Sequence, residues 1–275
     1  MLRTQLIAIV IALVTIVFLY NLPKVIINDT DKNKLADKSQ PHQNVSGAIN
    51  SAQELTISPL QVSEIEKLRK NFYGASDIKK RVIFADSLAN LFVAVQKFDS
   101  ASKYAGELVL LKADNRTRIA AGNIYYQIFS SLEDPTVANS FAAKAQEQYK
   151  EVLKSDPENA EVKNNLAMTY VTSENPMQAI ALLREVLAKN PSDETALFNL
   201  GLLSIRSGQY DKAVERFKRL TEINERNWKA HFYLGIALDE SGKKNEAVEK
   251  FDLVAKNTKD PDLKAEAERL IGRKN

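Results

Sequence analysis

The chain has 275 residues, 44% of them hydrophobic, which is enough apolar material for a substantial core. Lys and Arg total 38 against 35 Asp and Glu, so the net charge is only +3, and the two signs are interspersed along the chain. A nucleic-acid-binding protein normally concentrates positive charge on one face, so no nucleic-acid partner is expected. The absence of cysteine and the presence of only two histidines exclude disulfides, thiolate ligands and multi-histidine metal sites.

A long apolar segment opens the chain. Residues 6–20 carry no charge, and Lys24 interrupts the stretch 6–27 only near its end. At 1.5 Å per residue, this stretch crosses a hydrocarbon core of about 30 Å. We therefore predict a membrane anchor within residues 1–27. The alternative is a cleaved signal peptide, although the apolar core is long and bulky and no small-x-small cleavage site follows it.

Charges on either side of this segment bear on its orientation. Arg3 and the N-terminal amine precede it, which favours a cytoplasmic N-terminus with the body of the chain on the opposite side. Lys24, Lys32 and Lys34 follow the segment and weaken that argument. Residues 28–58 are polar and show no sustained helical or strand period, so we expect a flexible linker there.

From about residue 59 onward the pattern is helical, and residue types recur every 34 positions. A Leu-small pair is followed by an alanine, then by a large apolar residue and an aliphatic one. Four columns with one period are hard to obtain by chance. The columns are Leu166, Leu200 and Leu234; Ala145, Ala179, Ala213 and Ala247; Tyr149, Leu183, Phe217 and Phe251; and Val152, Val186, Leu220 and Val254.

These columns resemble the tetratricopeptide repeat, most closely over residues 197–224 and 231–257. The resemblance implies an all-α fold, namely a right-handed α-solenoid of helix-turn-helix repeats that follows the single N-terminal transmembrane helix. A helix over 58–74 should precede the first clear hairpin. Within a solenoid over 59–275, the expected units are repeats at about 81–115, 115–157, 158–191, 192–225 and 226–259, and a C-terminal capping helix at 260–273.

Small residues and one insertion mark special places in the repeats. Gly201 and Gly235 are predicted where the two helices of a hairpin cross closely, and Phe217 is expected to fill space between successive hairpins. Gly208 is predicted in a short turn, where glycine readily adopts positive φ. About ten extra residues fall within 130–140, either as a longer loop or as extended helix ends.

Residues with the chemistry of a catalytic site are missing from the repeat segment. His231 is its only histidine and occupies a periodic apolar position, so we interpret it as a packing residue. The chain has no glycine-flanked serine elbow, no phosphate-binding GxxxxGK[ST] motif and no GxGxxG motif. We therefore expect no enzymatic activity, no catalytic residues, no cofactor, no metal and no small-molecule substrate.

The resemblance also implies a binding groove. In tetratricopeptide proteins the first helix of each hairpin lines a concave surface that holds a peptide or a helix of a protein partner. In part of this family, a set of lysine, asparagine and arginine residues in the groove binds the tails of chaperones. That set is incomplete here, because its lysine position carries Ile119. Asn165 and Asn199 do not indicate such a site, because asparagine is common at their position in the family. The candidate groove residues are Asn123, Asn164, Met168, Thr172, Phe198, Leu202, Ile205, Phe232 and Ile236.

An anchor, a linker and a repeat domain without catalytic residues together predict a membrane-tethered scaffold. The resemblance favours a single-pass protein of the bacterial inner membrane, with the repeats in the periplasm, that assists assembly, translocation or folding of envelope proteins. Two alternatives remain open. One is a self-assembling structural subunit, and the other is an adaptor on an organelle membrane that faces the cytosol.

Overall fold

The computed structural model describes residues 57–171 and 176–272. The predicted anchor, nearly all of the predicted linker and the groove candidate Thr172 lie outside these residues. No helix in the described part combines the length and the hydropathy that a membrane crossing requires. The described residues form twelve α-helices and no strand: α2 (Pro59–Gly74), α3 (Ile78–Ala94), α4 (Phe98–Leu111), α5 (Asn115–Ser131), α6 (Pro135–Ser155), α7 (Ala160–Thr169), α8 (Met177–Lys189), α9 (Glu194–Arg206), α10 (Tyr210–Ile223), α11 (Trp228–Glu240), α12 (Lys244–Asn257) and α13 (Pro261–Gly272).

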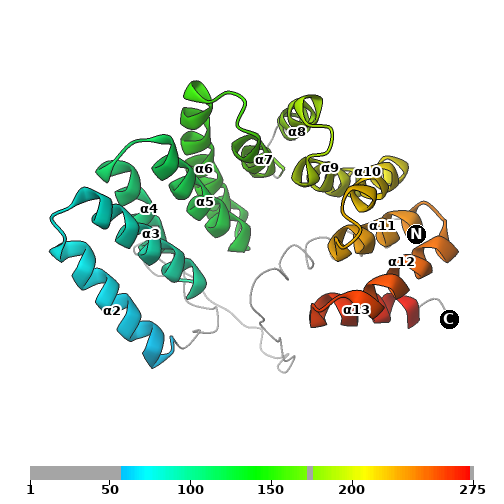
Figure 1. Cartoon of the computed structure of the whole chain (residues 1–275), viewed down its shortest axis with the longest axis horizontal. Helices are drawn as coiled ribbons and strands as arrows, with labels where there is room; N and C mark the ends of the chain where they lie inside the picture. The colour runs from blue at the N-terminus through cyan, green and yellow to red at the C-terminus, as the bar shows by residue number, and fades with distance from the viewer. Residues whose placement is uncertain (1–56, 172–175, 273–275) are drawn as a thin grey trace, which may run out of the picture.

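The helices pair into five consecutive hairpins that follow one another around an arc (Figure 1). The pairs are α3–α4, α5–α6, α7–α8, α9–α10 and α11–α12, and each hairpin packs on the next. The first helices α3, α5, α7, α9 and α11 also touch one another in succession, whereas the second helices of neighbouring hairpins make no comparable contact in the described part of the chain. The first helices therefore lie on the inner side of the arc, and the all-helical repeat fold predicted from the sequence is confirmed.

The first helices of all five hairpins begin with an Asp or Asn cap. The side chain of Asp77, Asp114, Asn159, Asp193 or Asn227 accepts a hydrogen bond from a backbone N–H of the first turn of its helix. These N–H groups have no partner inside the helix, so the caps stabilise each start. The second helices α4, α8, α10 and α12 lack such a cap, and α4, α10 and α12 start directly from a tight hairpin turn.

The turns of the first, fourth and fifth hairpins share one backbone geometry. Gly208 has φ of 70°, as predicted, Gly242 has φ of 86°, and Gln96 adopts φ of 55° at the same place in the first hairpin. In each turn the N–H after this residue donates to a carbonyl five residues earlier, which is the C-terminal motif that favours glycine. These bonds are Lys97 N to Phe92 O at 2.9 Å, Gln209 N to Ser204 O at 2.8 Å and Lys243 N to Leu238 O at 2.8 Å.

Three helix pairs cross where an aromatic ring covers a glycine. A Cβ atom built on Gly122, Gly201 or Gly235 would lie 2.6, 2.5 or 2.6 Å from a ring carbon of the second helix in the same hairpin. The rings are those of Tyr149, Phe217 and Phe251, which correspond in the 34-residue period. The predicted close crossings are confirmed, and these rings fill the gap inside their own hairpin. Phe217 was expected to fill space between successive hairpins. It does so in part, because its ring also stacks on that of Tyr233 in the next hairpin, with centroids 5.7 Å apart.

The insertion in the second hairpin lengthens its helices. Helix α5 has 17 residues and α6 has 21, compared with 13 and 14 in α9 and α10. Only residues 132–134 separate α5 from α6. Of the two possibilities left open by the sequence, the extra residues therefore form extended helix ends.

Buried apolar side chains run through the whole arc as two groups that meet at α9. Leu200 belongs to the group that begins at α2, whereas Leu197 belongs to the group that extends to α13. At the C-terminal end, α13 packs on α12 and buries Ala267 completely, with Leu263 and Leu270 partly buried beside it. Helix α13 thus covers apolar surface that the last hairpin would otherwise expose.

Candidate functional site

Fewer of the predicted groove residues are exposed on the inner surface of the arc than the periodicity indicated. Three of the predicted groove residues are interior: Asn164, Ile205 and Phe232 have exposed fractions of 3%, 1% and 1%. The Nδ2 of Asn164 donates to Oδ1 of Asp193, the cap of α9, at 3.1 Å. The ring of Phe232 lies 5.7 Å from that of Phe251. Neighbouring helices cover these three side chains, so almost none of their surface is left for a partner.

The other described groove candidates are partly exposed. They come from α5, α7, α9 and α11 in turn, so they form a strip along the inner helices, which we call the inner strip. Phe198 is held by edge-to-face contacts with Phe217 and Tyr233, at centroid distances of 5.7 and 5.3 Å. The inner strip consists of Asn123, Met168, Phe198, Leu202 and Ile236.

Asn123 belongs to a hydrogen-bonded group that joins three helices. The hydroxyl of Tyr149 on α6 donates to Oδ1 of Asn123 on α5 at 2.7 Å. The Nδ2 of Asn165 on α7 donates to the same oxygen at 3.1 Å. Tyr149 is fully buried, and burial holds the pKa of its hydroxyl far above the ordinary value, so the group remains a donor.

From the 34-residue period alone, Tyr149 is expected only to pack, because it stands in a column of large apolar residues. One signal was visible, because Tyr149 is the single tyrosine in a column whose other members are Leu183, Phe217 and Phe251. A buried hydroxyl is costly without a partner, so a lone tyrosine in an apolar column points to a specific hydrogen bond.

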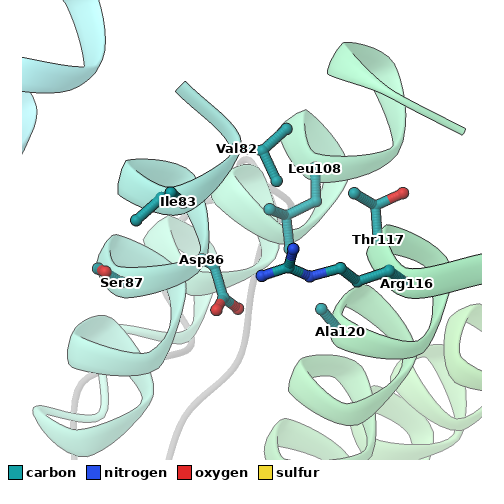
Figure 2. Close-up of a pocket in the computed structure, with 8 residues that line it drawn as sticks. All are labelled: Val82, Ile83, Asp86, Ser87, Leu108, Arg116, Thr117 and Ala120. Atoms are coloured by element: carbon teal, nitrogen blue, oxygen red, sulfur yellow. The ribbon is translucent and has the colours of Figure 1, made fainter. Parts of the chain in front are cut away.

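A small pocket of about 100 Å³ opens between α3 and α5 (Figure 2). Leu108 lines it together with side chains of both inner helices, and the Asp86 carboxylate and the Arg116 guanidinium lie on facing sides. Burial raises the pKa of Asp86 despite a hydrogen bond from Asn90 and the nearby positive charge of Arg116. Nothing in the sequence singled out this pocket, because its walls come from helices of different repeats. Its lining is Val82, Ile83, Asp86, Ser87, Leu108, Arg116, Thr117 and Ala120.

His231 is a core residue, as predicted. Its exposed fraction is 7%, and its ring stacks on Trp228 with centroids 5.7 Å apart. Its Nε2 lies 3.1 Å from the carbonyl oxygen of Glu225, while its buried Nδ1 has no hydrogen-bond partner. Burial lowers the pKa of the ring, so the neutral form is favoured. The described residues contain no group of three or more His, Cys, Asp or Glu that could hold a metal ion.

This architecture defines a class of protein: an α-helical repeat protein whose first helices line an inner surface. Two tetratricopeptide repeat family models match the chain, at residues 139–203 and 205–262. The chain therefore contains tetratricopeptide repeats. A comparison with curated proteins finds no match.

Solved structures similar to this chain include tetratricopeptide repeat proteins. One from Parabacteroides merdae is 18% identical with a TM-score of 0.58, and the match covers 78% of this chain and 80% of that one. The crystal structure of MamA is 22% identical with a TM-score of 0.49, covering 62% and 94% of the two chains. YrrB, described as a TPR protein with an unusual peptide-binding site, is 21% identical with a TM-score of 0.46, covering 76% and 97%. At 18% identity, the likeness to the Parabacteroides merdae protein concerns the fold alone.

Proposed function

We propose that this protein is a membrane-tethered scaffold that binds a protein partner, or an extended segment of one, on the inner surface of its arc. The observation that carries the proposal is the inner strip, in which partly exposed apolar side chains and an amide follow one another on α5, α7, α9 and α11. Apolar surface with a few amides suits a peptide or an amphipathic helix. Helical-repeat proteins generally use such concave surfaces for binding, which favours a scaffold over an enzyme.

Site-specific crosslinking tests this proposal. A photoreactive residue placed at Met168 on the inner strip should capture a protein partner in cells, to be identified by mass spectrometry. The same residue placed at Lys218, which is exposed on the second helix α10, is the matched control and should not capture that partner. Equal capture at both sites, or capture at neither, would contradict binding on the inner surface.

The membrane tether is a separate part of the proposal, and it rests on the uncharged stretch 6–20 within the apolar segment 6–27. We propose that residues 6–27 form an uncleaved anchor in the bacterial inner membrane and that the repeats lie in the periplasm. There the scaffold would assist assembly, translocation or folding of envelope proteins.

Two measurements test the tether. The full chain should remain with membranes during alkaline extraction, whereas a variant lacking residues 1–27 should be released. Added protease should digest the C-terminal repeats in spheroplasts with an intact inner membrane. Protection from protease would place the repeats on the cytoplasmic side, and release of the full chain by alkali would exclude the anchor.

A further inference from the structure

The N-terminal end of the described stack is rich in exposed apolar side chains. Of the nine large apolar side chains that are exposed in the described part of the chain, five lie between residues 60 and 83. Leu60 and Tyr73 on α2 have exposed fractions of 78% and 64%, and Ile78 at the start of α3 is also exposed. Helix α2 is the first described helix of the arc and packs on the first hairpin, so its other side faces no described helix (Figure 1).

Basic residues gather at the same end. Residues 66–81 contain six Lys and Arg residues and only two acidic ones, Glu66 and Asp77. The net charge of this short segment therefore exceeds the +3 of the whole chain. The turn at residues 75–77 places the end of α2 next to the start of α3, so basic side chains from both helices meet at one corner of the stack.

Four of these six basic side chains have no partner of their own within the described residues. The guanidinium groups of Arg69 and Arg81 each lie over a buried phenylalanine ring, 5.2 and 5.1 Å from the ring centroids. The four lysines are exposed, and none forms an ion pair with a carboxylate of the described residues. Their ammonium groups are therefore available to anions outside the chain. These lysines are Lys67, Lys70, Lys79 and Lys80.

Apolar and basic side chains share one side of α2. Leu60, Lys67 and Lys70 follow one another at spacings of seven and three residues, so they lie along one side of the helix. Tyr73 follows three residues later at the edge of the same side. The buried Ile65 and Phe72 lie on the other side, against the first hairpin.

The C-terminal end of the stack lacks this combination. Helix α13 exposes no large apolar side chain among its described residues. Two of its basic residues pair with acidic residues of the same helix, Lys264 with Glu268 and Arg269 with Glu266. Closing the end of a stack therefore does not require the apolar and basic outer side that α2 presents.

We propose that this side of α2, together with the first residues of α3, binds the headgroup region of the membrane in which the predicted anchor lies. The lysine ammonium groups contact the phosphates of anionic lipids, and Leu60 and Tyr73 enter the interfacial layer. Residues 28–58 span at most about 110 Å even when fully extended, so the anchor would keep α2 close to this surface. This inference rests on the proposed tether and adds a second contact with the lipid.

A second copy of the chain fits this surface less well. Two copies that met through this side of α2 would bring their unpaired lysines together, and like charges repel each other across an interface. Anionic headgroups complement the same lysines. The inner strip lies on α5, α7, α9 and α11, so lipid contact through α2 leaves it open to a protein partner.

The test uses the full chain reconstituted into phosphatidylcholine vesicles with or without phosphatidylglycerol. Because the chain has no cysteine, Ser63→Cys on the exposed side of α2 gives a single site for an environment-sensitive fluorophore. We expect its emission to shift to the blue in the anionic vesicles only, and the shift to disappear in high salt, which screens the lysines. The same label on Ala265→Cys, exposed on α13, is the control and should not respond to lipid charge.

Three variants of the chain labelled at position 63 test the residues. Lys67→Glu with Lys70→Glu should lower the ratio of bound to unbound α2 at least about tenfold, since each lysine near an anionic surface contributes to binding. Lys218→Glu with Lys244→Glu makes the same change of charge at exposed positions of α10 and α12 and should leave the ratio unchanged. Leu60→Ser should lower the ratio severalfold without changing the thermal midpoint, because this leucine is exposed.

Alkaline extraction of the same vesicles separates this inference from the tether. A chain that stays in the membrane but has the same emission with both lipids would overturn the inference and leave the tether standing. Equal loss of the shift in the two charge-reversed variants would also overturn it. A shift that depends on protein density instead of lipid charge would identify a second copy on this surface, with the same consequence. Release by alkali would overturn the tether, whereas a shift confined to anionic vesicles would still support the lipid contact.

Discussion

The contact between a glycine and a ring is the smallest unit on which the hairpins depend. Gly201 and Phe217 are both buried, and the ring occupies the volume that a Cβ on residue 201 would need. In the third hairpin the corresponding pair is Ala167 and Leu183, both completely buried. A larger residue on the first helix is thus matched by a smaller one on the second, which keeps the filled volume similar.

Gly201→Ala tests this complementarity. Its Cβ would approach the Phe217 ring to 2.5 Å, so the ring or the helix must move, and we expect a loss of about 1–3 kcal/mol in the free energy of unfolding. The double change Gly201→Ala with Phe217→Leu reproduces the pair of the third hairpin and should be less destabilised than the sum of the two single changes. Urea unfolding measures all four proteins, and strict additivity would show that the two sites are not coupled.

His231 should make stability depend on pH. Its pKa is lowered chiefly by burial and further by the charge of Lys250, so the unfolded chain binds a proton more readily than the folded one. Stability should therefore be constant above the ordinary histidine pKa of about 6.5 and should fall as the pH drops below it. His231→Phe should remove that loss, measured as thermal midpoints from pH 7.5 to 5. Because His42 is present in both proteins, their difference reports His231 alone, and identical slopes would refute the assignment.

Individual residues of the inner surface were only partly predictable. Periodicity gives the helix on which Asn164, Ile205 and Phe232 lie, and it correctly identifies that helix as one that lines the arc. Each first helix, however, packs against its own partner helix and against helices of at least one neighbouring hairpin, so only a narrow strip stays open. Which residues face that strip depends on how the helices are rotated, and a period of 34 residues does not contain that information.

At the scale of elements, the sequence predicted most of the hairpins because local rules and the period agree. The glycine turns and the Leu-small and alanine columns each mark a place that the structure confirms, and Asp or Asn caps start all five first helices. The first hairpin was harder, because Gln96 stands where glycine would have marked its turn. The insertion was located within 130–140, but sequence could not decide between loop and helix, since residues such as Thr136 and Val137 are compatible with either.

Gln96 offers a simple stabilising change. A residue with a Cβ at φ of 55° is strained by about 1 kcal/mol relative to glycine, and the turn geometry is the one in which Gly208 sits. Gln96→Gly should therefore raise the free energy of unfolding by about 0.5–1 kcal/mol. Gly208→Ala should lower it by about 1 kcal/mol in the same assay. A destabilised Gln96→Gly protein would show that the glutamine side chain has a role that outweighs the strain.

The described helices form a linear stack, and the apolar surface at its C-terminal end must be covered. Ala267 of α13 is completely buried against the last hairpin, whereas Ala265 on the same helix is exposed. Ala267→Asp would bury a charge without a partner and should cost about 2–4 kcal/mol, with self-association of the exposed end of the stack. Ala265→Asp, the same change on the exposed side, should leave stability within about 0.5 kcal/mol. Thermal melts and light scattering measure both effects, and equal behaviour of the two variants would refute a capping role for α13.

The order of contacts along the arc also has a mechanical consequence. Each hairpin touches only its neighbours, and successive inner helices touch each other while the outer ones make no comparable contact among the described residues. Bending stiffness therefore resides at the junctions, and a slight rotation at each one adds up to a large change in curvature between the ends. The stack should therefore change its curvature elastically to fit partners of different diameter while every hairpin stays folded. Under force applied to its two ends, the hairpins should unfold one after another.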